Sequence, residues 1–264
     1  MFLIKHSLIA KIMILNKITI LKIQISNISI SFILEEIEEW LRKGQKKYKI
    51  FTPNPEIIVL AQKDKTFQKI LNSADLSLPD GAGIIWAGKL LGQPFLERVS
   101  GVDFMKRLCG FCASKGFTIG LIGGKKMIAL KTAECLKKSY PGLNIILAEH
   151  WDPDISTQRI IEARRNKRQI DVLFVAYGQG KQERWIADNL EKIPVKMAMG
   201  VGGAFDYISG QVPRAPKLMR NLGFEWLFRL IRQPWRIKRQ LIGGQFFLLV
   251  LREWARRQTV SIVH

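Results

Sequence analysis

The stretch Ile170–Ala176, with the sequence IDVLFVA, is apolar along nearly its whole length and is followed directly by Tyr177-Gly178. Three more segments have the same character, namely GFTIGLI at Gly116–Ile122, LNIIL at Leu143–Leu147 and VKMAM at Val195–Met199. Helical patterns separate them at Lys125–Ser139, Ile155–Lys167 and Gln182–Leu190. Apolar strands that alternate with helices are typical of a parallel sheet buried on both faces. We therefore expect an α/β fold: a Rossmann-like, mostly parallel sheet with helices on both faces.

The same alternation extends toward the N-terminus. Ile and Thr residues favour a strand at Lys17–Ile25, and a helix is expected at Glu35–Lys43 before the short strand Lys47–Phe51. Asn54-Pro55-Glu56 has the composition of a helix start, with an Asn cap and Pro in the first position, and predicts one helix to about Asn72. Residues 17–210 are thus expected to form the α/β domain, with 1–16 as an extension before it.

The composition changes after Gly210. The segment from Arg214 to Arg257 holds eleven basic residues against two acids, Glu225 and Glu253, and the basic residues are Arg214, Lys217, Arg220, Arg229, Arg232, Arg236, Lys238, Arg239, Arg252, Arg256 and Arg257. Aromatic residues are interleaved with them, as in helices that lie on an anionic membrane. We therefore predict a basic helical appendage at residues 211–264.

The net charge of +20 points to anionic partners, whether nucleic acid, acidic lipid or phosphorylated small molecules. The longest uncharged run near the N-terminus, Ile23–Leu34, is shorter than the about 20 apolar residues that span a bilayer. We therefore expect no transmembrane helix there.

Two motifs suggest metal or redox chemistry. Cys109 and Cys112 form a CxxC pair, but they fall in a helical pattern and are expected to be buried helix residues of a reduced, intracellular protein. Asp152-Pro153-Asp154 has the DxD spacing with which many nucleotide-sugar enzymes hold a divalent cation. The central proline favours a turn and a helix cap instead. We predict neither a metal nor another cofactor.

Ligands of parallel α/β sheets bind outside the carboxyl ends of the strands. This rule places Asp80, Gly123-Gly124, Tyr177-Gly178 and Gly200–Gly203 along one edge. The Gly123 and Gly124 amides could hold a diphosphate at a helix N-terminus, although they lack the full GxGxxG spacing and such glycines also serve only to bend the chain.

Three polar positions have both a structural and a functional interpretation. The segment Thr52–Glu56 (TPNPE) can be a strand end and helix cap, or a stiff loop that presents Thr52 and Asn54 to a substrate. The PDG sequence around Asp80 is a common turn signal. Arg98 can bind an anion or be held by Asp103.

The order of the motifs resembles one family. TPNPE, LPDGAGIIWAGKLLG, ERVSGVD, LIGG, YGQGKQERW, GVGGAFDYISG and RAPKLMRNLGFEWLFRLIRQPWR follow one another as in the WecG/TagA/CpsF glycosyltransferases, over about Lys17–Leu241. The resemblance implies an inverting, metal-independent enzyme of surface polysaccharide or wall teichoic acid synthesis. Such an enzyme transfers N-acetylmannosamine or its uronic acid from a UDP donor to polyprenyl-diphosphate-linked N-acetylglucosamine. It works in the cytoplasm on the inner face of the cell membrane, with no nucleic acid as partner.

The resemblance also implies roles for single residues. Asp80 matches the proposed general base, and Thr52, Asn54, Arg98 and Gln182 match residues of the active site. Arg229, Arg236 and Arg239 match basic residues that close over the substrate diphosphates. This is chemically sensible, because one carboxylate suffices for inverting transfer and arginines can neutralise a leaving diphosphate without a metal. The spacing of these arginines, with Arg232, predicts one face of a single helix.

Other classes of protein remain as alternatives. A nucleic-acid-binding protein would explain the basic and aromatic composition but gives Asp80 no use. A Rossmann-type oxidoreductase requires a dinucleotide fingerprint that the glycine turns do not supply. A noncatalytic membrane-surface module would tolerate joint loss of Thr52, Asn54 and Asp80. The sequence leaves the oligomeric state open, including self-association through the apolar side of the appendage.

Overall fold

The computed structural model describes residues 16–44, 46–125, 127–150, 152–164 and 169–262. Its centre is a sheet of six strands in the order β4-β3-β8-β7-β5-β6 within these described residues. The strands are β3 (Tyr48–Phe51), β4 (Leu76–Ser77), β5 (Thr118–Gly123), β6 (Asn144–Glu149), β7 (Ile170–Ala176) and β8 (Val195–Gly200). Every pairing in this sheet is parallel, which confirms the predicted fold class.

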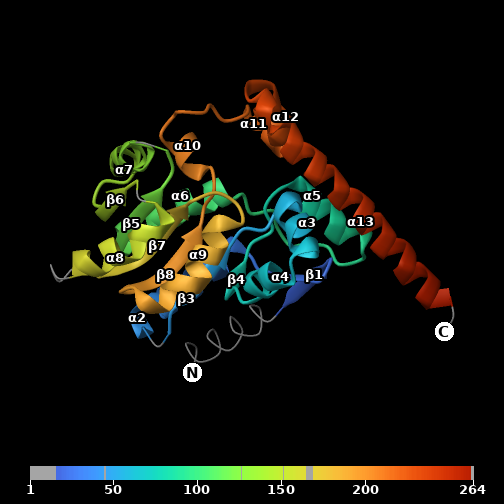
Figure 1. Ribbon diagram of the computed structural model, residues 1–264, viewed down its shortest axis with the longest axis horizontal. Coiled ribbons are helices and arrows are strands. Elements are labelled where there is room, and N and C mark those ends of the chain that lie inside the picture. The colour runs from blue at the N-terminus through green and yellow to red at the C-terminus, as the bar shows by residue number, and fades with distance from the viewer. Residues whose placement is uncertain (1–15, 45, 126, 151, 165–168, 263–264) are drawn as a thin grey trace.

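Helices cover both faces of the sheet (Figure 1). In β7, Val172 and Phe174 point into one core while Leu173 and Val175 point into the other, as the two-residue period of a strand requires. The first core is closed by α2 (Ile30–Lys43), α6 (Gly101–Lys115), α7 (Ile128–Ser139) and α10 (Ala204–Ile208). The second is closed by α3 (Pro55–Lys63), α4 (Lys65–Asn72), α5 (Ala82–Leu90), α8 (Pro153–Arg164) and α9 (Lys181–Asn189), with the short η1 (Leu190–Lys192) after it.

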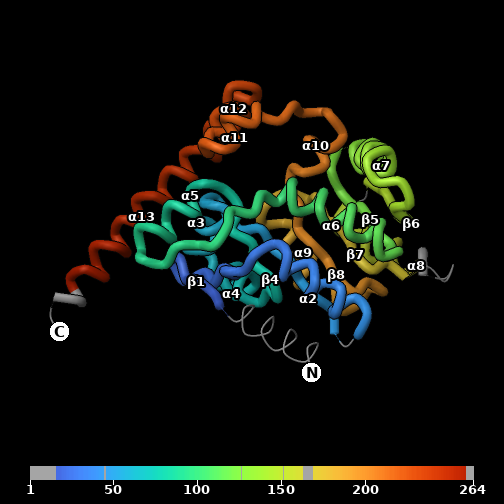
Figure 2. The backbone as a smooth tube through the Cα atoms, turned by 180° about the vertical axis from the view of Figure 1, so that it is seen from behind, coloured from blue at the N-terminus to red at the C-terminus, as the bar shows by residue number. Residues whose placement is uncertain are grey.

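Residues 211–262, the C-terminal arm, follow α10. The arm comprises α11 (Lys217–Asn221), α12 (Glu225–Arg232), η2 (Pro234–Arg236) and the long α13 (Ile237–Ile262). Figures 1 and 2 show α13 running along α3 and α5, where Phe246 and Val250 are buried in the second core. Among the described residues, none of the helices has the length and apolarity needed to cross a bilayer.

The structure corrects two predicted elements. Lys17–Ile25 is not one strand but a hairpin of β1 (Lys17–Ile20) and β2 (Ile23–Ser26), which form a separate antiparallel sheet. Its turn residues Leu21 and Lys22 both have positive φ, at 48° and 66°, and neither is the Gly or Asn that usually signals such a turn. The predicted N-terminal extension lies outside the described residues except for Asn16.

The predicted helix from Asn54 to Asn72 is two helices. Asp64 ends α3 with extended backbone and then caps α4 by accepting a hydrogen bond from the Phe67 N–H at 2.9 Å. The sequence contains no proline or glycine at this break, and so the acidic cap alone indicates it. By contrast, the predicted burial of the CxxC pair on a helix is confirmed, because Cys109 and Cys112 are fully buried residues of α6 and burial raises the pKa of Cys112 to about 12.

Gly123 allows β5 and β7 to end side by side. It has φ +92°, and a Cβ atom there would lie 2.8 Å from the Ala176 carbonyl carbon. We predict that Gly123→Ala lowers the free energy of unfolding by about 3 kcal/mol, from backbone strain and steric overlap together. Gly142→Ala is the matched control, because φ is +89° but no atom lies within 4 Å of the added Cβ. Urea denaturation that gives equal losses for both variants would contradict the proposed overlap.

Candidate active site

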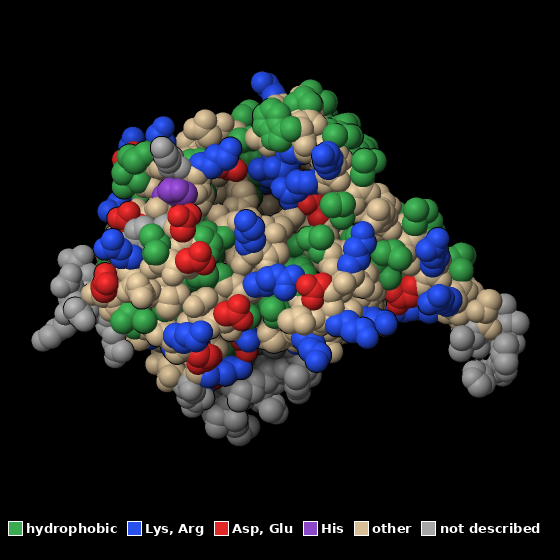
Figure 3. All heavy atoms as spheres, in the orientation of Figure 1, with side chains coloured by type: hydrophobic (Ala, Val, Ile, Leu, Met, Phe, Trp, Pro, Cys, Tyr) green, Lys and Arg blue, Asp and Glu red, His purple; other side chains and the backbone are tan. Residues whose placement is uncertain are grey.

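The carboxyl ends of the parallel strands bring the predicted polar loops into one row. Asp80 follows β4, Thr52 follows β3 and Tyr177–Gly180 follow β7, while Gly200–Gly203 and Gly123-Gly124 begin at the last residues of β8 and β5. Since these strands are neighbours in the order β4-β3-β8-β7-β5, the loops lie along one edge, as predicted. Figure 3 shows a hollow in the face of the molecule with Lys and Arg side chains on its rim.

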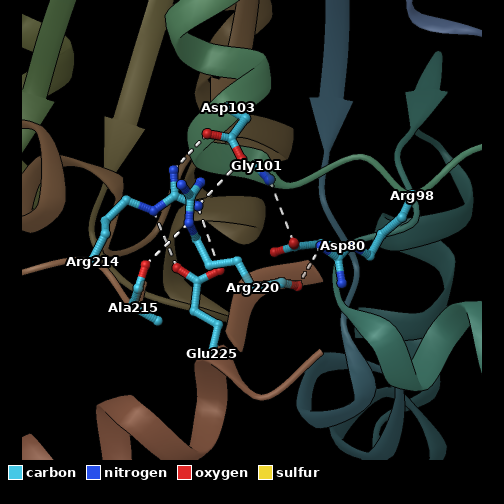
Figure 4. A network of polar contacts seen from close by, with 8 residues as sticks. All are labelled: Asp80, Arg98, Gly101, Asp103, Arg214, Ala215, Arg220 and Glu225. Atoms are coloured by element: carbon cyan, nitrogen blue, oxygen red, sulfur yellow. Dashed lines mark hydrogen bonds and ion pairs between the residues drawn. The ribbon is translucent and has the colours of Figure 1, made fainter. Parts of the chain in front are cut away.

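Asp80 both makes the turn and points its carboxylate toward α6. The Leu78 N–H donates to the Phe51 carbonyl at 2.8 Å, and the Asp80 N–H donates to the Pro53 carbonyl at 3.1 Å. These bonds tie the loop after β4 to the loop after β3. The Asp80 Oδ1 accepts a hydrogen bond from the Gly101 N–H at 3.4 Å, at the first residue of α6 (Figure 4).

The surroundings of Asp80 favour its protonated form. Burial, together with the nearby Glu225 carboxylate, raises the pKa of Asp80 to about 7, although the Gly101 N–H, Arg98 and Arg214 act in the opposite direction. The side chain keeps partial contact with solvent. A carboxyl group with a pKa near 7 can accept a proton at neutral pH, which is what general-base catalysis requires.

Thr52 and Asn54 belong to the loop after β3, to which the Asp80 loop is hydrogen-bonded. Thr52 is buried and its Oγ1 lies 3.4 Å from the position of a Cβ on Gly101, so that Gly101 makes room for it. The Asn54 Oδ1 caps α3 by accepting a hydrogen bond from the Ile57 N–H at 3.1 Å. The cap interpretation of Asn54 is therefore confirmed, and its contact with a substrate stays a prediction.

Gln182 connects two of the loops from within the protein. It is buried, its Oε1 accepts a hydrogen bond from the Gly202 N–H at 2.9 Å, and its Nε2 donates to the Glu183 Oε1 at 2.8 Å. Glu183 is fully buried and its Oε2 accepts from the Gly180 N–H at 2.7 Å. The pair therefore fixes the loop after β7 relative to the loop after β8.

The turn of Gly123 and Gly124 differs from the predicted arrangement. The Gly124 N–H donates to the Ala176 carbonyl at 2.9 Å, and α7 begins at Ile128 rather than at Lys125. Met127, with φ 61°, stands between the turn and the helix. The Gly124 amide is thus engaged within the protein, and diphosphate binding by this turn stays a prediction without direct support.

The arginines of the arm are not on one helix, contrary to prediction. Arg229 and Arg232 belong to α12, Arg236 to η2 and Arg239 to α13, because Gln233-Pro234 interrupts the helical run. Arg232 is exposed and stacks on the Phe228 ring at 5.6 Å. The other three nevertheless converge at the carboxyl edge of the sheet.

Arg229 and Arg239 contact the segments that follow three different strands. An Arg229 amino group lies 3.5 Å from the Asp206 Oδ2 and 2.7 Å from the position of a Cβ on Gly203, after β8. Arg239 donates to Glu56, after β3, at 2.8 Å from Nε, and to Gln179, after β7. The arm is thereby fixed across the row of loops.

Arg236 lies close to Arg229 and Arg239, and its guanidinium group can still donate a hydrogen bond to a ligand. Burial and the positive charges of Arg229 and Arg239 together lower the pKa of Arg236 to about 10. Among the described residues, its Nε is a buried nitrogen without a hydrogen-bond partner. Buried donors and mutually repelling guanidinium groups are stabilised by an anion, and planar guanidinium groups suit phosphate oxygens.

Asp103 holds Arg214 and not Arg98, which corrects the structural alternative suggested for Arg98. Arg98 is exposed and donates to the Arg220 carbonyl at 2.8 Å, whereas Asp103 pairs with Arg214 at 2.5 Å. Arg214 and its second partner Glu225 were not predicted as site residues, since in the sequence they are only part of a basic stretch. Arg214 and Glu225 are far from Asp103 in the sequence, so no local sequence pattern could predict that these residues pair.

Asp152-Pro153 begins α8, as the turn interpretation predicted: the Asp152 carbonyl accepts hydrogen bonds from the Ser156 N–H at 3.1 Å and Oγ at 2.8 Å. Within the described ranges, no group of three or more His, Cys, Asp and Glu side chains is placed to hold a metal ion.

Comparison with known proteins identifies relatives along most of the chain. Residues 18–260 match the profile described as the Glycosyl transferase WecG/TagA/CpsF family. A protein of Bacillus subtilis (strain 168), named N-acetylglucosaminyldiphosphoundecaprenol N-acetyl-beta-D-mannosaminyltransferase, is 35% identical over 210 residues, covering 80% of this chain and 81% of the relative. A protein of the same name from Bacillus spizizenii (strain ATCC 23059 / NRRL B-14472 / W23) is 34% identical over 203 residues, covering 77% and 78%.

The raised pKa of Asp80 predicts how stability depends on pH. Because the folded-state pKa of about 7 exceeds the ordinary value of 3.8, the charged carboxylate destabilises the fold above pH 7, and this cost disappears as the pH falls toward 4. Asp80→Asn should therefore raise the free energy of unfolding by about 2 kcal/mol at pH 8, allowing for partial screening by solvent, and change little at pH 4.

Urea denaturation at the two pH values checks this, with the exposed Asp188→Asn on α9 as control. A pH-independent difference between Asp80→Asn and the unsubstituted protein would contradict the raised pKa.

Proposed function

Because the chain belongs to the WecG/TagA/CpsF family of glycosyl transferases, we propose that it transfers N-acetylmannosamine, or its uronic acid, from a UDP donor to polyprenyl-diphosphate-linked N-acetylglucosamine. The acceptor and the sugar are those in the names of the two Bacillus relatives. The chain is a glycosyltransferase, and the product would serve cell-surface polysaccharide or teichoic acid synthesis. The observation that supports this function best is the convergence of Arg229, Arg236 and Arg239 at the same sheet edge as Asp80.

The proposed reaction inverts the anomeric configuration in one displacement. Asp80 in its carboxylate form accepts the proton of the acceptor hydroxyl while that oxygen forms a bond to the anomeric carbon. The bond from this carbon to the UDP oxygen breaks on the opposite face, and its electron pair leaves with UDP. One carboxylate is enough for this chemistry, and its pKa near 7 keeps a large fraction deprotonated at neutral pH.

The leaving UDP carries negative charge that must be neutralised. Arg229 and Arg239 are already paired with Asp206 and Glu56, whereas the Arg236 Nε is buried without a partner among the described residues. We therefore assign Arg236 the central contact with the diphosphate, supported by its two neighbours. Positive groups fixed in place before the reaction stabilise developing charge without reorganisation, which lowers the barrier. No metal is required in this proposal.

The outer surface of the arm suits a lipid-linked acceptor. Large apolar side chains are exposed there, namely Leu218, Leu222, Phe224, Trp226, Ile231, Trp235, Ile237, Leu241 and Leu248. Figure 3 shows hydrophobic side chains gathered over α11 and α12, with Lys and Arg nearby. Apolar and basic groups together favour the surface of an anionic membrane. We propose that the arm rests on the inner face of the cell membrane, where it meets the acceptor.

Loss of the Asp80 carboxylate tests the reaction. We predict that Asp80→Asn lowers acceptor-dependent UDP release from UDP-N-acetylmannosamine at least about 100-fold, because a general base contributes about 10²–10⁴ to the rate. For the unsubstituted enzyme, kcat/KM should rise with pH and level off above about pH 7, where Asp80 is deprotonated. The assay uses a soluble diphosphate-linked N-acetylglucosamine lipid analogue, and Asp188→Asn is the control. Equal release by both variants would remove Asp80 from the mechanism.

Removal of single arginines tests the diphosphate site. Arg236→Met should weaken UDP binding about 10- to 100-fold, since a charge-assisted contact contributes about 1.5–3 kcal/mol. Arg232→Met is matched in chemistry and lies four residues away, but its exposed guanidinium stacks on Phe228 outside the cluster and its loss should leave the Kd unchanged. Isothermal titration with UDP measures both. The same loss in both variants would indicate a diffuse charge effect rather than a site.

A further inference from the structure

The helices α11 and α12, which we call the front of the C-terminal arm, have little apolar attachment to the protein body. Neither α11 nor α12 contains a buried residue, whereas α13 inserts Phe246 and Val250 into the core. The other buried apolar residues of the arm, Val212 and Ala215, precede α11. Hydrophobic burial, the usual source of helix attachment, therefore anchors the arm before and after α11 and α12 but not at these two helices. Polar contacts must hold α12 over the active site.

Arg214 makes the most extensive of these contacts. Its guanidinium donates to both Asp103 oxygens of α6, at 2.5 and 3.2 Å, and to both Glu225 oxygens of α12, at 3.2 and 3.4 Å (Figure 4). We call Asp103, Arg214 and Glu225 the Arg214 clasp. The Arg214 side chain is only 19% exposed, and its planar fork pairs with two carboxylates at once, which is the strong form of an ion pair.

The Arg214 clasp lies next to the loop of the catalytic base. Between Arg214 and Glu225 the arm passes so close to α5 that a Cβ on Gly223 would lie 2.6 Å from the Ala82 Cβ, two residues beyond Asp80. On the same side, Arg98 donates to the Arg220 carbonyl at 2.8 Å. Figure 4 shows Asp80 among Gly101, Arg98 and this part of the arm.

We propose that Arg214 is a positioning residue for the transfer reaction: by joining α6 to α12 it holds the front of the arm against the Asp80 loop and so creates the enclosed surroundings in which Asp80 acts. The inference rests on the proposed function for its catalytic meaning. Its structural content stands without it, since the position of the arm can be measured with no substrate present.

The proposal predicts in which direction the pKa of Asp80 shifts when α12 is released. The charged groups that face Asp80 are Arg98 from the preceding loop, Arg214 and Glu225, with the Gly101 N–H of α6. Of the two causes that raise its pKa, Glu225 belongs to α12, and our proposal assigns part of the burial to the arm, which passes beside Ala82 at Gly223. Release of α12 should therefore lower the Asp80 pKa from about 7 toward its ordinary value of 3.8, even though Arg214 itself is lost.

The test uses the full chain with Arg214→Gln. We expect backbone amides of α12 to exchange with deuterium at least about 10-fold faster, while those of β7 and β8 are unchanged. The Asp80 carboxyl, followed by NMR with ¹³C-labelled aspartate, should titrate at least one pH unit lower. The apparent pKa on the acid side of the kcat/KM profile should also fall, and the maximal rate should decrease. Arg184→Gln, which removes the Arg184–Asp64 ion pair between α9 and the start of α4, outside the Arg214 clasp, is the control and should leave all three readouts unchanged.

Unchanged α12 exchange or an unchanged or raised Asp80 pKa in Arg214→Gln would overturn the proposal. Glu225→Gln, which removes the other half of the Arg214 clasp, should also accelerate exchange of α12, and it decides the question if Arg214→Gln does not fold. Accelerated exchange with a lowered Asp80 pKa, but no transfer by any variant or by the unsubstituted protein, would leave Arg214 as a holder of the arm and would count against the proposed function instead.

Discussion

Mutual repulsion among three half-buried guanidinium groups is the constraint on which the rest of this structure depends. Arg229, Arg236 and Arg239 lie together at the carboxyl edge of the sheet, and the pKa of Arg236 falls to about 10 through burial and the charges of its neighbours. Such a cluster costs free energy in the empty protein. Two features offset this cost: carboxylates hold the outer arginines, and α13 buries Phe246 and Val250 between α3 and α5. The remaining unpaired donor is what a diphosphate can satisfy.

The same arrangement explains why Asp80 differs from an ordinary turn residue. Its backbone closes the turn that the PDG sequence predicts, through hydrogen bonds to the loop after β3. Its carboxylate faces a site that the C-terminal arm encloses, and burial there raises its pKa to about 7. The proposed base and the proposed phosphate-binding groups thus both depend on the docking of one segment. An enzyme built in this way has its charge-stabilising groups and its base in place together, and the chemistry follows from the arm's position.

The sequence predicted those parts of the fold that local patterns encode. The apolar runs of β5, β6, β7 and β8 and the rule on carboxyl ends were enough to place the loops in one row. The hairpin at Leu21-Lys22 could not be seen, because ordinary residues adopt positive φ there, and the break at Gln233-Pro234 was hidden by the regular spacing of the arginines. The contacts of Arg214 with Asp103 and of Arg239 with Gln179 join distant positions, which no local pattern reports. The roles of Asp80 and the arginines were predicted by resemblance to a family, and the structure adds the physical surroundings that make those roles plausible.

The central claim is that the C-terminal arm completes a phosphate-binding site at the carboxyl edge of the sheet. A crystal structure of the full chain with UDP bound tests this most directly. The account predicts diphosphate oxygens within hydrogen-bond distance of the Arg236 Nε, with the guanidinium groups of Arg229 and Arg239 on either side. A diphosphate held instead by the Gly123-Gly124 turn, with the arm arginines unchanged and out of contact, would contradict it.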